Sequence, residues 1–384
     1  MLKYHPDRYV HSRPFFQPLF RTFQKFADAE GVLPASRLMQ MFNRFLHGYW
    51  NPELMRHPVE KRPENPTQMI VGEHSMFCHA AQFTLCGRNI FHLSTALRGL
   101  LCVTDVDDVL WRSIKLPYPA LYLWFGPQDY WRFGNGKYFA DGAYISSFSR
   151  GGNALQIFVT TQERDVDYSR PPSFAIHRDF YYYIAFEFTD DAETVGTTLQ
   201  RVLQTSPDYQ RGFEPPSPDA ETVRLANEHG ITLMKKPGRD TAQSRVVEER
   251  FADLPVFRQV LRLIVNGLCY LSSPSREVVR RYPDNAHERL SRVSPAKAQS
   301  ERQRLRQEGY TEINFCGESI DREYAGVFTG RELSPHWRRG HWRNQACGPA
   351  LSEHHLMWIR PTLVRKDKQA IEDTIPGHLY HVTE

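Results

Sequence analysis

The sequence lacks the short signatures by which several enzyme classes are recognised. It contains no GxxxxGK(S/T) phosphate loop, no GxSxG nucleophile elbow, no HExxH zinc helix and no GxGxxG dinucleotide turn. These absences argue against the common nucleotide-dependent, serine-hydrolase and zinc-protease classes. The chain also has no internal repeat, so a solenoid is not expected.

The six cysteines are scattered along the chain and never form a CxxC pair. This spacing argues against a zinc ribbon and against a disulfide framework, and it favours reduced thiols in a cytoplasm. The N-terminal residues 1–14 contain no apolar core of a signal peptide. No run of about 18 apolar residues is present to span a bilayer. We therefore expect a cytoplasmic protein that does not have a membrane as a partner.

The charge of the chain is mild but unevenly placed. A net charge of +4 over 384 residues does not by itself indicate nucleic acid. The basic residues, however, crowd into the last third of the chain. The 24 Phe and 18 Tyr provide ample material for a core, and the 26 Pro predict many irregular connections.

Hydrophobic periodicity predicts an α+β protein in four regions. A helical N-terminal region covers residues 1–115, and a central α+β domain with a mostly antiparallel sheet and packed helices covers 116–272. A polar, flexible segment follows at 273–310, and a basic aromatic region at 311–384. The predicted helices are 14–29, one from Pro34, 83–101, 194–203, 219–229 and 246–271 with a break at Pro255. The predicted strands are 120–125, 137–148, 154–161, 180–188 and 355–364.

Residues 336–343, HWRRGHWR, form the densest cluster of recognition chemistry in the chain. They hold two His-Trp pairs, three arginines and one glycine. Indoles and imidazoles offer flat surfaces for stacking, and guanidinium groups bind carboxylates, phosphates or carbonyls as rigid forks. The cluster predicts a binding surface or an active site. The alternative is an exposed basic turn whose tryptophans plug the edge of a core.

Metal binding is the weakest of the chemical readings. His336, His341 and Cys347, with His354 and His355 nearby, supply enough ligands for zinc on paper, but the arginines between them repel a dication. The run Asp105 to Asp108 suits Mg²⁺, yet an acidic first turn of a short helix explains it better. We expect no metal and no cofactor.

A ribonuclease remains open as an alternative. Arg331 and His336 match the RxxxxH spacing of some helical ribonucleases, although Pro335 disfavours a regular helix there. In such an enzyme His336 and His341 would exchange protons while the arginines stabilise a phosphate.

Recognition without catalysis is the reading we favour. The predicted surface takes a peptide or single-stranded RNA, and the residue types do not separate the two ligands. Its residues are His336, Trp337, Arg338, Arg339, His341, Trp342, Arg343, Trp358 and Arg360.

The same C-terminal residues resemble the type V-A anti-CRISPR family of phage and plasmid proteins. In that family an Arg-Arg-Gly-His-Trp core is followed, after a linker that contains glycine, by a Trp-x-Pro strand. Here the core is residues 338–342, and the strand holds Trp358 and Pro361 with a spacing that differs by one residue. Looser likeness covers the strand after Pro119, the hairpin near Asp141 and the helix that ends at Ser272.

The resemblance implies a protein that recognises a polypeptide of a CRISPR effector nuclease inside a bacterial host cell. Family members are expected to lower the effector's transcript and protein level rather than block the finished enzyme. The implied partner is therefore a target polypeptide, including one still being made on the ribosome. RNA is the alternative partner.

Overall fold

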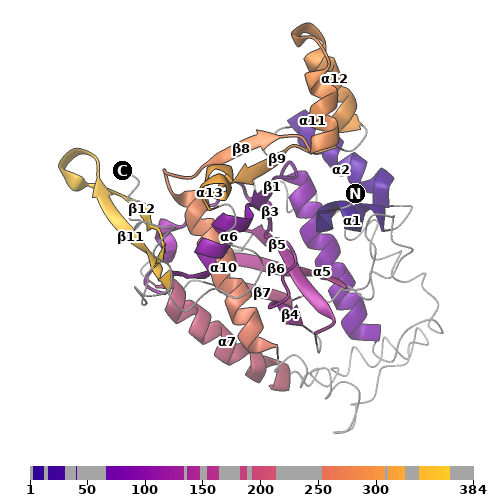
Figure 1. Cartoon of the computed structure of the whole chain (residues 1–384). Helices are drawn as coiled ribbons and strands as arrows, with labels where there is room; N and C mark the ends of the chain where they lie inside the picture. Colours follow the sequence, from indigo (N-terminus) through magenta and orange to yellow (C-terminus); the bar gives the residue numbers. More distant parts are fainter. Residues whose placement is uncertain are drawn as a thin grey trace, which may run out of the picture.

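The computed structural model describes residues 3–12, 16–30, 40, 66–133, 136–147, 154–163, 182–187, 193–212, 253–307, 310–324 and 337–363. Within these residues the fold is α+β, as predicted. Figure 1 shows one large sheet with helices on both faces, a helical arm at the top and a β-hairpin at the left.

The central sheet is mixed and mostly antiparallel, as the sequence predicts. Its strand order is β7-β6-β5-β3-β1-β9-β8, with β4 paired to β5. The short strand β1 runs parallel to both of its neighbours, β3 and β9, whereas the other pairs are antiparallel. The bounds are β1 Ile90–Leu93, β3 Ala120–Trp124, β4 Arg132–Phe133, β5 Tyr138–Ser146, β6 Ala154–Glu163, β7 Tyr182–Glu187, β8 Val278–Arg281 and β9 Ile313–Cys316.

Helices cover the two faces of this sheet and create two apolar clusters. One face carries the larger cluster, with helices α6, α7 and α10, and the other face carries the N-terminal helices. The bounds are α1 His5–His11, α2 Phe16–Glu30, α5 Pro66–Leu85, α6 Thr95–Cys102, η3 Trp111–Ser113, α7 Val195–Gly212, α10 Leu254–Ser272, α11 Asp284–Ser291, α12 Pro295–Gln307 and α13 Glu318–Glu323.

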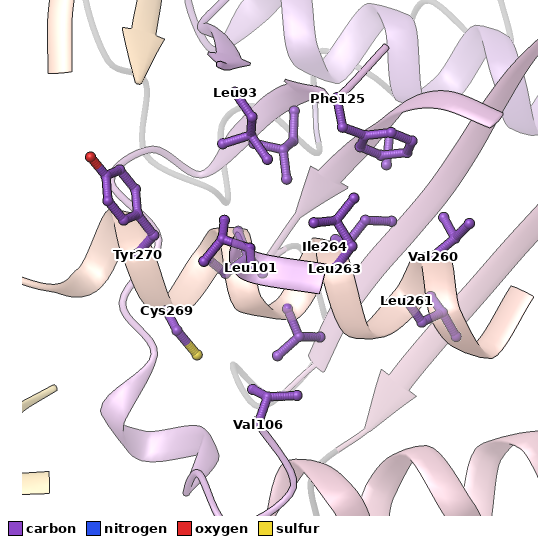
Figure 2. Close-up of a cluster of buried hydrophobic side chains, with 14 of the residues drawn as sticks. Leu93, Leu101, Val106, Phe125, Val260, Leu261, Leu263, Ile264, Cys269 and Tyr270 are labelled. Atoms are coloured by element: carbon purple, nitrogen blue, oxygen red, sulfur yellow. The ribbon is translucent and has the colours of Figure 1, made fainter. Parts of the chain in front are cut away.

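Helix α10 is the central helix of the larger cluster. Figure 2 shows Leu263 and Ile264 among side chains of the sheet side and of α6, including Leu93, Leu101 and Phe125. By length and composition α10 would also pass as a membrane span, but most of it is buried inside this protein. It begins just before Pro255, because proline is tolerated in the first turn of a helix.

The N-terminal helices are fastened to the opposite face by a buried ion pair. Arg8 of α1 donates to the Asp141 carboxylate at 2.6 Å, and both side chains are almost fully enclosed. Asp141 lies at a bulge in β5 and also accepts from the Thr160 hydroxyl at 2.7 Å. Next to it, a Cβ on Gly142 would lie 2.1 Å from the Tyr122 hydroxyl, so the position has no room for a side chain.

The predicted helix over 83–101 is wrong. Helix α5 ends at Leu85, the chain turns at Gly87 and Arg88 with positive φ, and β1 then precedes α6. The segment 273–310, predicted as polar and flexible, contains β8, α11 and α12. The predicted helices from Pro34 and at 219–229, and the part of 246–271 before residue 253, lie outside the described residues.

The C-terminal region forms a β-hairpin that packs on the edge of the larger cluster. Strand β11 pairs antiparallel with β12, and its first residues also pair parallel with the two-residue strand β2. A short pair, β10 with β13, closes the base of the hairpin. The bounds are β2 Thr104–Asp105, β10 Trp337–Arg338, β11 Gly340–Cys347, η5 Pro349–Leu351, β12 Glu353–Ile359 and β13 Thr362–Leu363.

Candidate functional site

The register of β11 and β12 sorts the residues of the hairpin onto two faces. Residues that stand opposite each other in an antiparallel pair share a face, and neighbours along a strand alternate. Trp342 stands opposite Trp358, and His341 stands opposite Ile359. Trp342, Trp358 and Leu356 are buried, whereas His341 and Arg343 are exposed. The hairpin therefore has a core-facing side and an outward side.

The core-facing side is fixed by a polar clasp around Asn266 in the middle of α10. The Trp342 indole N–H donates to Asn266 Oδ1 at 2.7 Å, and Asn266 Nδ2 donates to the Thr104 carbonyl at 3.1 Å. The Trp358 indole N–H donates to Thr104 Oγ1, also at 3.1 Å. Both indoles thus satisfy their single donor inside the core, as buried tryptophans need to do.

Ring packing reinforces the clasp. The Trp342 and Trp358 rings are stacked, with centroids 5.8 Å apart and planes 19° from parallel. Tyr270 of α10 meets Trp358 edge-on at 5.9 Å. Arg360 lies over the Trp358 ring at 5.7 Å and pairs with Glu323 of α13 at 3.2 Å. Arg360, predicted as a ligand contact, therefore already has an aromatic and an acidic partner in the fold.

Gly340 belongs to the same assembly because the chains approach too closely there for a side chain. A Cβ at this position would lie 2.7 Å from Pro361 Cδ and 2.8 Å from both the Ile359 carbonyl oxygen and Thr104 Oγ1. Two residue types in the Arg-Arg-Gly-His-Trp core are thus structural. The glycine lets β11 lie against β2, and the tryptophan anchors it to α10.

The outward side carries the remaining recognition chemistry. His341 and Arg343 lie on the outward side of β11; Arg338 and Arg339, which precede β11, are also exposed, and Arg338 stands opposite Thr362 in the β10–β13 pair. Of the other predicted residues, Trp337 is placed in β10 without its side chain being described, and His336 lies outside the described residues. Trp342 and Trp358 fill the edge of the core, which is the role that the alternative interpretation gives to tryptophans. Among the described residues, the exposed members of the predicted surface are Arg338, Arg339, His341 and Arg343, and their role in binding stays a prediction.

The backbone of the hairpin offers a second kind of contact. Within the described residues β12 pairs with β11 alone, so its other edge has no strand beside it. An unpaired edge presents a row of N–H and C=O groups that an extended chain can join.

The possible metal ligands weighed in the sequence analysis do not come together in the described part of the chain. No group of three or more His, Cys, Asp or Glu side chains converges there. Asp105 and Asp107 instead bind Arg262 of α10, at 2.8 Å and 2.5 Å. The expected acidic first turn of a helix is wrong, because Asp105 lies in β2 and Asp107 in a turn. His355 and Cys347 approach each other, with Nδ1 and Sγ 3.1 Å apart.

Sequence reasoning missed Asn266 and Thr104, the two residues that hold the hairpin. Asn266 is the one polar residue in the run Leu263 to Leu271 apart from the Tyr270 hydroxyl, and this was the available signal. A buried polar side chain needs a hydrogen-bonding partner, so an isolated Asn in an apolar helix points to a specific contact. The identity of that partner depends on tertiary structure.

Comparison with known proteins identifies the family of the chain. Residues 91–366 match the profile of the AcrVA2-like family, described as the anti-CRISPR type V subtype A2 family. The chain belongs to this family. The match runs from β1 past β13 and so includes the sheet, α10 and the hairpin, but not α1, α2 and α5. The resemblance inferred from residues 336–364 is confirmed.

One solved structure, that of AcrVA2, is similar to the chain over most of its length. It has 13% sequence identity and a TM-score of 0.41, and it covers 93% of this chain and 97% of its own. The chain matches no curated protein.

Proposed function

We propose that the outward side of the β11–β12 hairpin binds an extended segment of a CRISPR effector polypeptide. The segment is bound while the effector is being made, and its production falls as a result. The proposal rests on one observation. The hairpin has basic side chains on its outward side, and the buried Trp342 and Trp358 hold it against the core. The family supports anti-CRISPR activity, and the target and the mode of binding are our inference.

The free edge of β12 favours a peptide over other ligands. Strand addition gives affinity through main-chain hydrogen bonds and gives specificity through alternate side chains. Met357 and Ile359 are half-buried on the outward side of β12, beside the exposed Arg343 and His341 of β11. A peptide paired with this edge would contact the apolar side chains of β12 and, next to them, the basic side chains of β11.

The charge of the outward side predicts an acidic or polar target segment. Arg338, Arg339 and Arg343 are exposed, and guanidinium groups bind carboxylates and backbone carbonyls in forked geometry. Because the tryptophan clasp holds the hairpin in one position, little ordering cost remains to be met on binding.

Binding is tested with immobilised peptides that tile the type V-A effector. We expect a few neighbouring peptides to be captured by the wild type. The variant Arg338→Ala/Arg339→Ala/Arg343→Ala should bind them on the order of 10- to 100-fold more weakly, because three surface charge contacts are lost. The matched control Arg21→Ala/Lys25→Ala/Lys297→Ala removes three exposed cations of α2 and α12, away from the hairpin, and should bind like the wild type.

The effect on production is tested in cells with a reporter fused to the captured segment. A frameshifted version keeps nearly the same RNA but encodes a different peptide. We expect the protein to lower the in-frame reporter and to spare the frameshifted one. Equal loss of both reporters would indicate that RNA is recognised instead, and equal capture by the triple variant would remove the hairpin from the mechanism.

A further inference from the structure

A groove lies between α2 and α12, on the side of the molecule where the helical arm projects. It joins two hollows that share Gln24 and Asp28 of α2. The inner hollow is a cavity of about 250 Å³ that reaches Tyr118, Tyr282 and Tyr310. The outer hollow, about 750 Å³, runs between α2 and α12. We call the two together the α2–α12 groove.

Two buried polar atoms that line the groove have no partner among the described residues. Tyr282 is 2% exposed, and its hydroxyl makes no hydrogen bond. Gln24 donates through Nε2 to Asp28 at 3.0 Å, while its Oε1 is enclosed and unpaired. Leaving such atoms unpaired costs free energy, and most buried polar groups in proteins avoid it. Both atoms are enclosed by protein, so they record an unmet hydrogen-bonding demand in the wall of the groove and do not themselves face a ligand in it.

The outer hollow is cationic, and its cations are uncommitted. Arg21 and Lys25 of α2 face the groove together with Arg302 of α12, and none of the three has an acidic partner within the described residues. In the inner hollow the cations are already paired. Arg88 binds Asp7 at 2.8 Å, and Arg280 binds Glu312 at 2.9 Å.

The arm that forms one wall carries the excess charge of the chain. Residues 284–307, which form α11 and α12, contain six Lys or Arg and three Asp or Glu, a net charge of +3, and the whole chain has +4. The apolar support of α11 and α12 is small, a cluster of Tyr282, Ala286 and Leu305. Helices α11 and α12 bury few apolar side chains, so their basic charge is better explained by an anionic partner than by a contribution to stability.

We propose that the α2–α12 groove binds single-stranded RNA. Phosphates lie against Arg21, Lys25 and Arg302, and one base enters the inner hollow. The cavity falls just below the range of about 300–1,000 Å³ for pockets of drug-sized ligands, which suits a single base. The rings of Tyr118 and Tyr310, which line the inner hollow, can stack on a base.

This inference is separate from the proposed function. Helices α2 and α12, whose side chains line the groove, and the β11–β12 hairpin lie at different corners of the molecule (Figure 1). An acidic polypeptide would also be attracted by the three cations. It would not make use of a ring-sized cavity flanked by Tyr118, Tyr282 and Tyr310, and this is why we favour RNA.

Fluorescence anisotropy of a labelled single-stranded RNA with the full chain tests the proposal at several salt concentrations. For single strands the slope of log K against log salt changes by about 0.7 per phosphate contact. The variant Arg21→Glu/Lys25→Glu/Arg302→Glu should therefore lower the steepness of the slope by about 2. Tyr118→Leu removes one ring that lines the inner hollow, and it should weaken binding about 5- to 100-fold without changing the slope.

The control Arg112→Glu/Lys115→Glu/Arg258→Glu has the same change in charge at exposed positions away from the groove. It should keep the wild-type slope after a uniform loss of affinity. The proposal fails if this control and the groove variant have the same slope, or if Tyr118→Leu binds RNA as tightly as the wild type. It also fails if a poly-glutamate peptide displaces the RNA as effectively as unlabelled RNA does.

Discussion

The indole of Trp342 and the amide of Asn266 are joined by a 2.7 Å hydrogen bond between the C-terminal hairpin and the central helix. Both side chains are buried, at 8% and 1% exposure. The bond explains why a motif that looks like a pure recognition surface contains a tryptophan that no ligand can reach.

Replacement of Asn266 by alanine should destabilise the protein more than its size suggests. The Trp342 N–H and the Thr104 carbonyl would both lose their partner inside the core. At about 1–3 kcal/mol for each of the two unsatisfied groups, we expect the free energy of unfolding to fall by about 2–6 kcal/mol. Denaturant titration measures this. The control Asn344→Ala, at an exposed position of β11, should change it by less than about 0.5 kcal/mol.

Gly340→Ala should displace the hairpin. The new Cβ would meet the Ile359 carbonyl oxygen at 2.8 Å and the Pro361 ring at 2.7 Å, and neither can move without shifting the backbone. We expect weaker peptide capture together with a lower Tm, although the substitution does not touch the outward side. An unchanged Tm would show that the approach of β11 to β2 is looser than described.

Acid should destabilise the protein through its buried histidines. Burial lowers the pKa of His79 to about 3, and burial together with Lys3, Arg98 and Arg281 lowers the pKa of His92 to about 3. In the unfolded chain both return to about 6.5. Between these values the unfolded state binds more protons than the folded state, so stability falls as the pH falls from about 6.5 towards 3.

The measurement is the free energy of unfolding at a series of pH values. His79→Gln and His92→Gln should each make the acid-side loss of stability shallower, whatever they do to stability at neutral pH. His354→Gln, at an exposed position of the hairpin, is the control for loss of a histidine. Parallel curves for all of these proteins would contradict the expectation.

Thiol labelling should report on the hairpin. Burial raises the pKa of Cys78, Cys86 and Cys102 to about 12, so these thiols stay protonated and react slowly. Cys347 is half-buried on the outward side and contacts His355. We expect iodoacetamide to modify Cys347 first in the native protein, as mass spectrometry of peptides would show. A bound target peptide should slow that reaction.

The sequence was informative where a local pattern decides the structure. Strands 120–125 and 154–161 were predicted nearly as they occur, because β-branched and aromatic residues dominate them. Strand β1 was missed because Ile90 to Leu93 lies in a long apolar stretch, where four residues cannot be told from part of a helix. Its strand character comes from pairing with β3 and β9, and no local pattern records that.

For the candidate site, too, the local sequence and the tertiary contacts supply different information. The cluster 336–343 could be singled out because its composition is unusual, and its role in binding stays a prediction. Its residues could not be divided into structural and exposed ones, because the division depends on Asn266 and Thr104, distant in sequence. Alternation along a strand would have separated His341 from Trp342, but it does not say which of the two faces the core.

The position of β9 has a consequence for how the protein is made. Strand β1 emerges early from the ribosome, yet its second parallel neighbour, Ile313–Cys316, is synthesised more than two hundred residues later. Until then the middle of the sheet has an open edge, which can pair wrongly with other chains. A message truncated before residue 313 would therefore yield an aggregation-prone fragment rather than a smaller working protein. In this fold a premature stop codon would prevent the whole molecule from folding, including the part of the sheet that has already been synthesised.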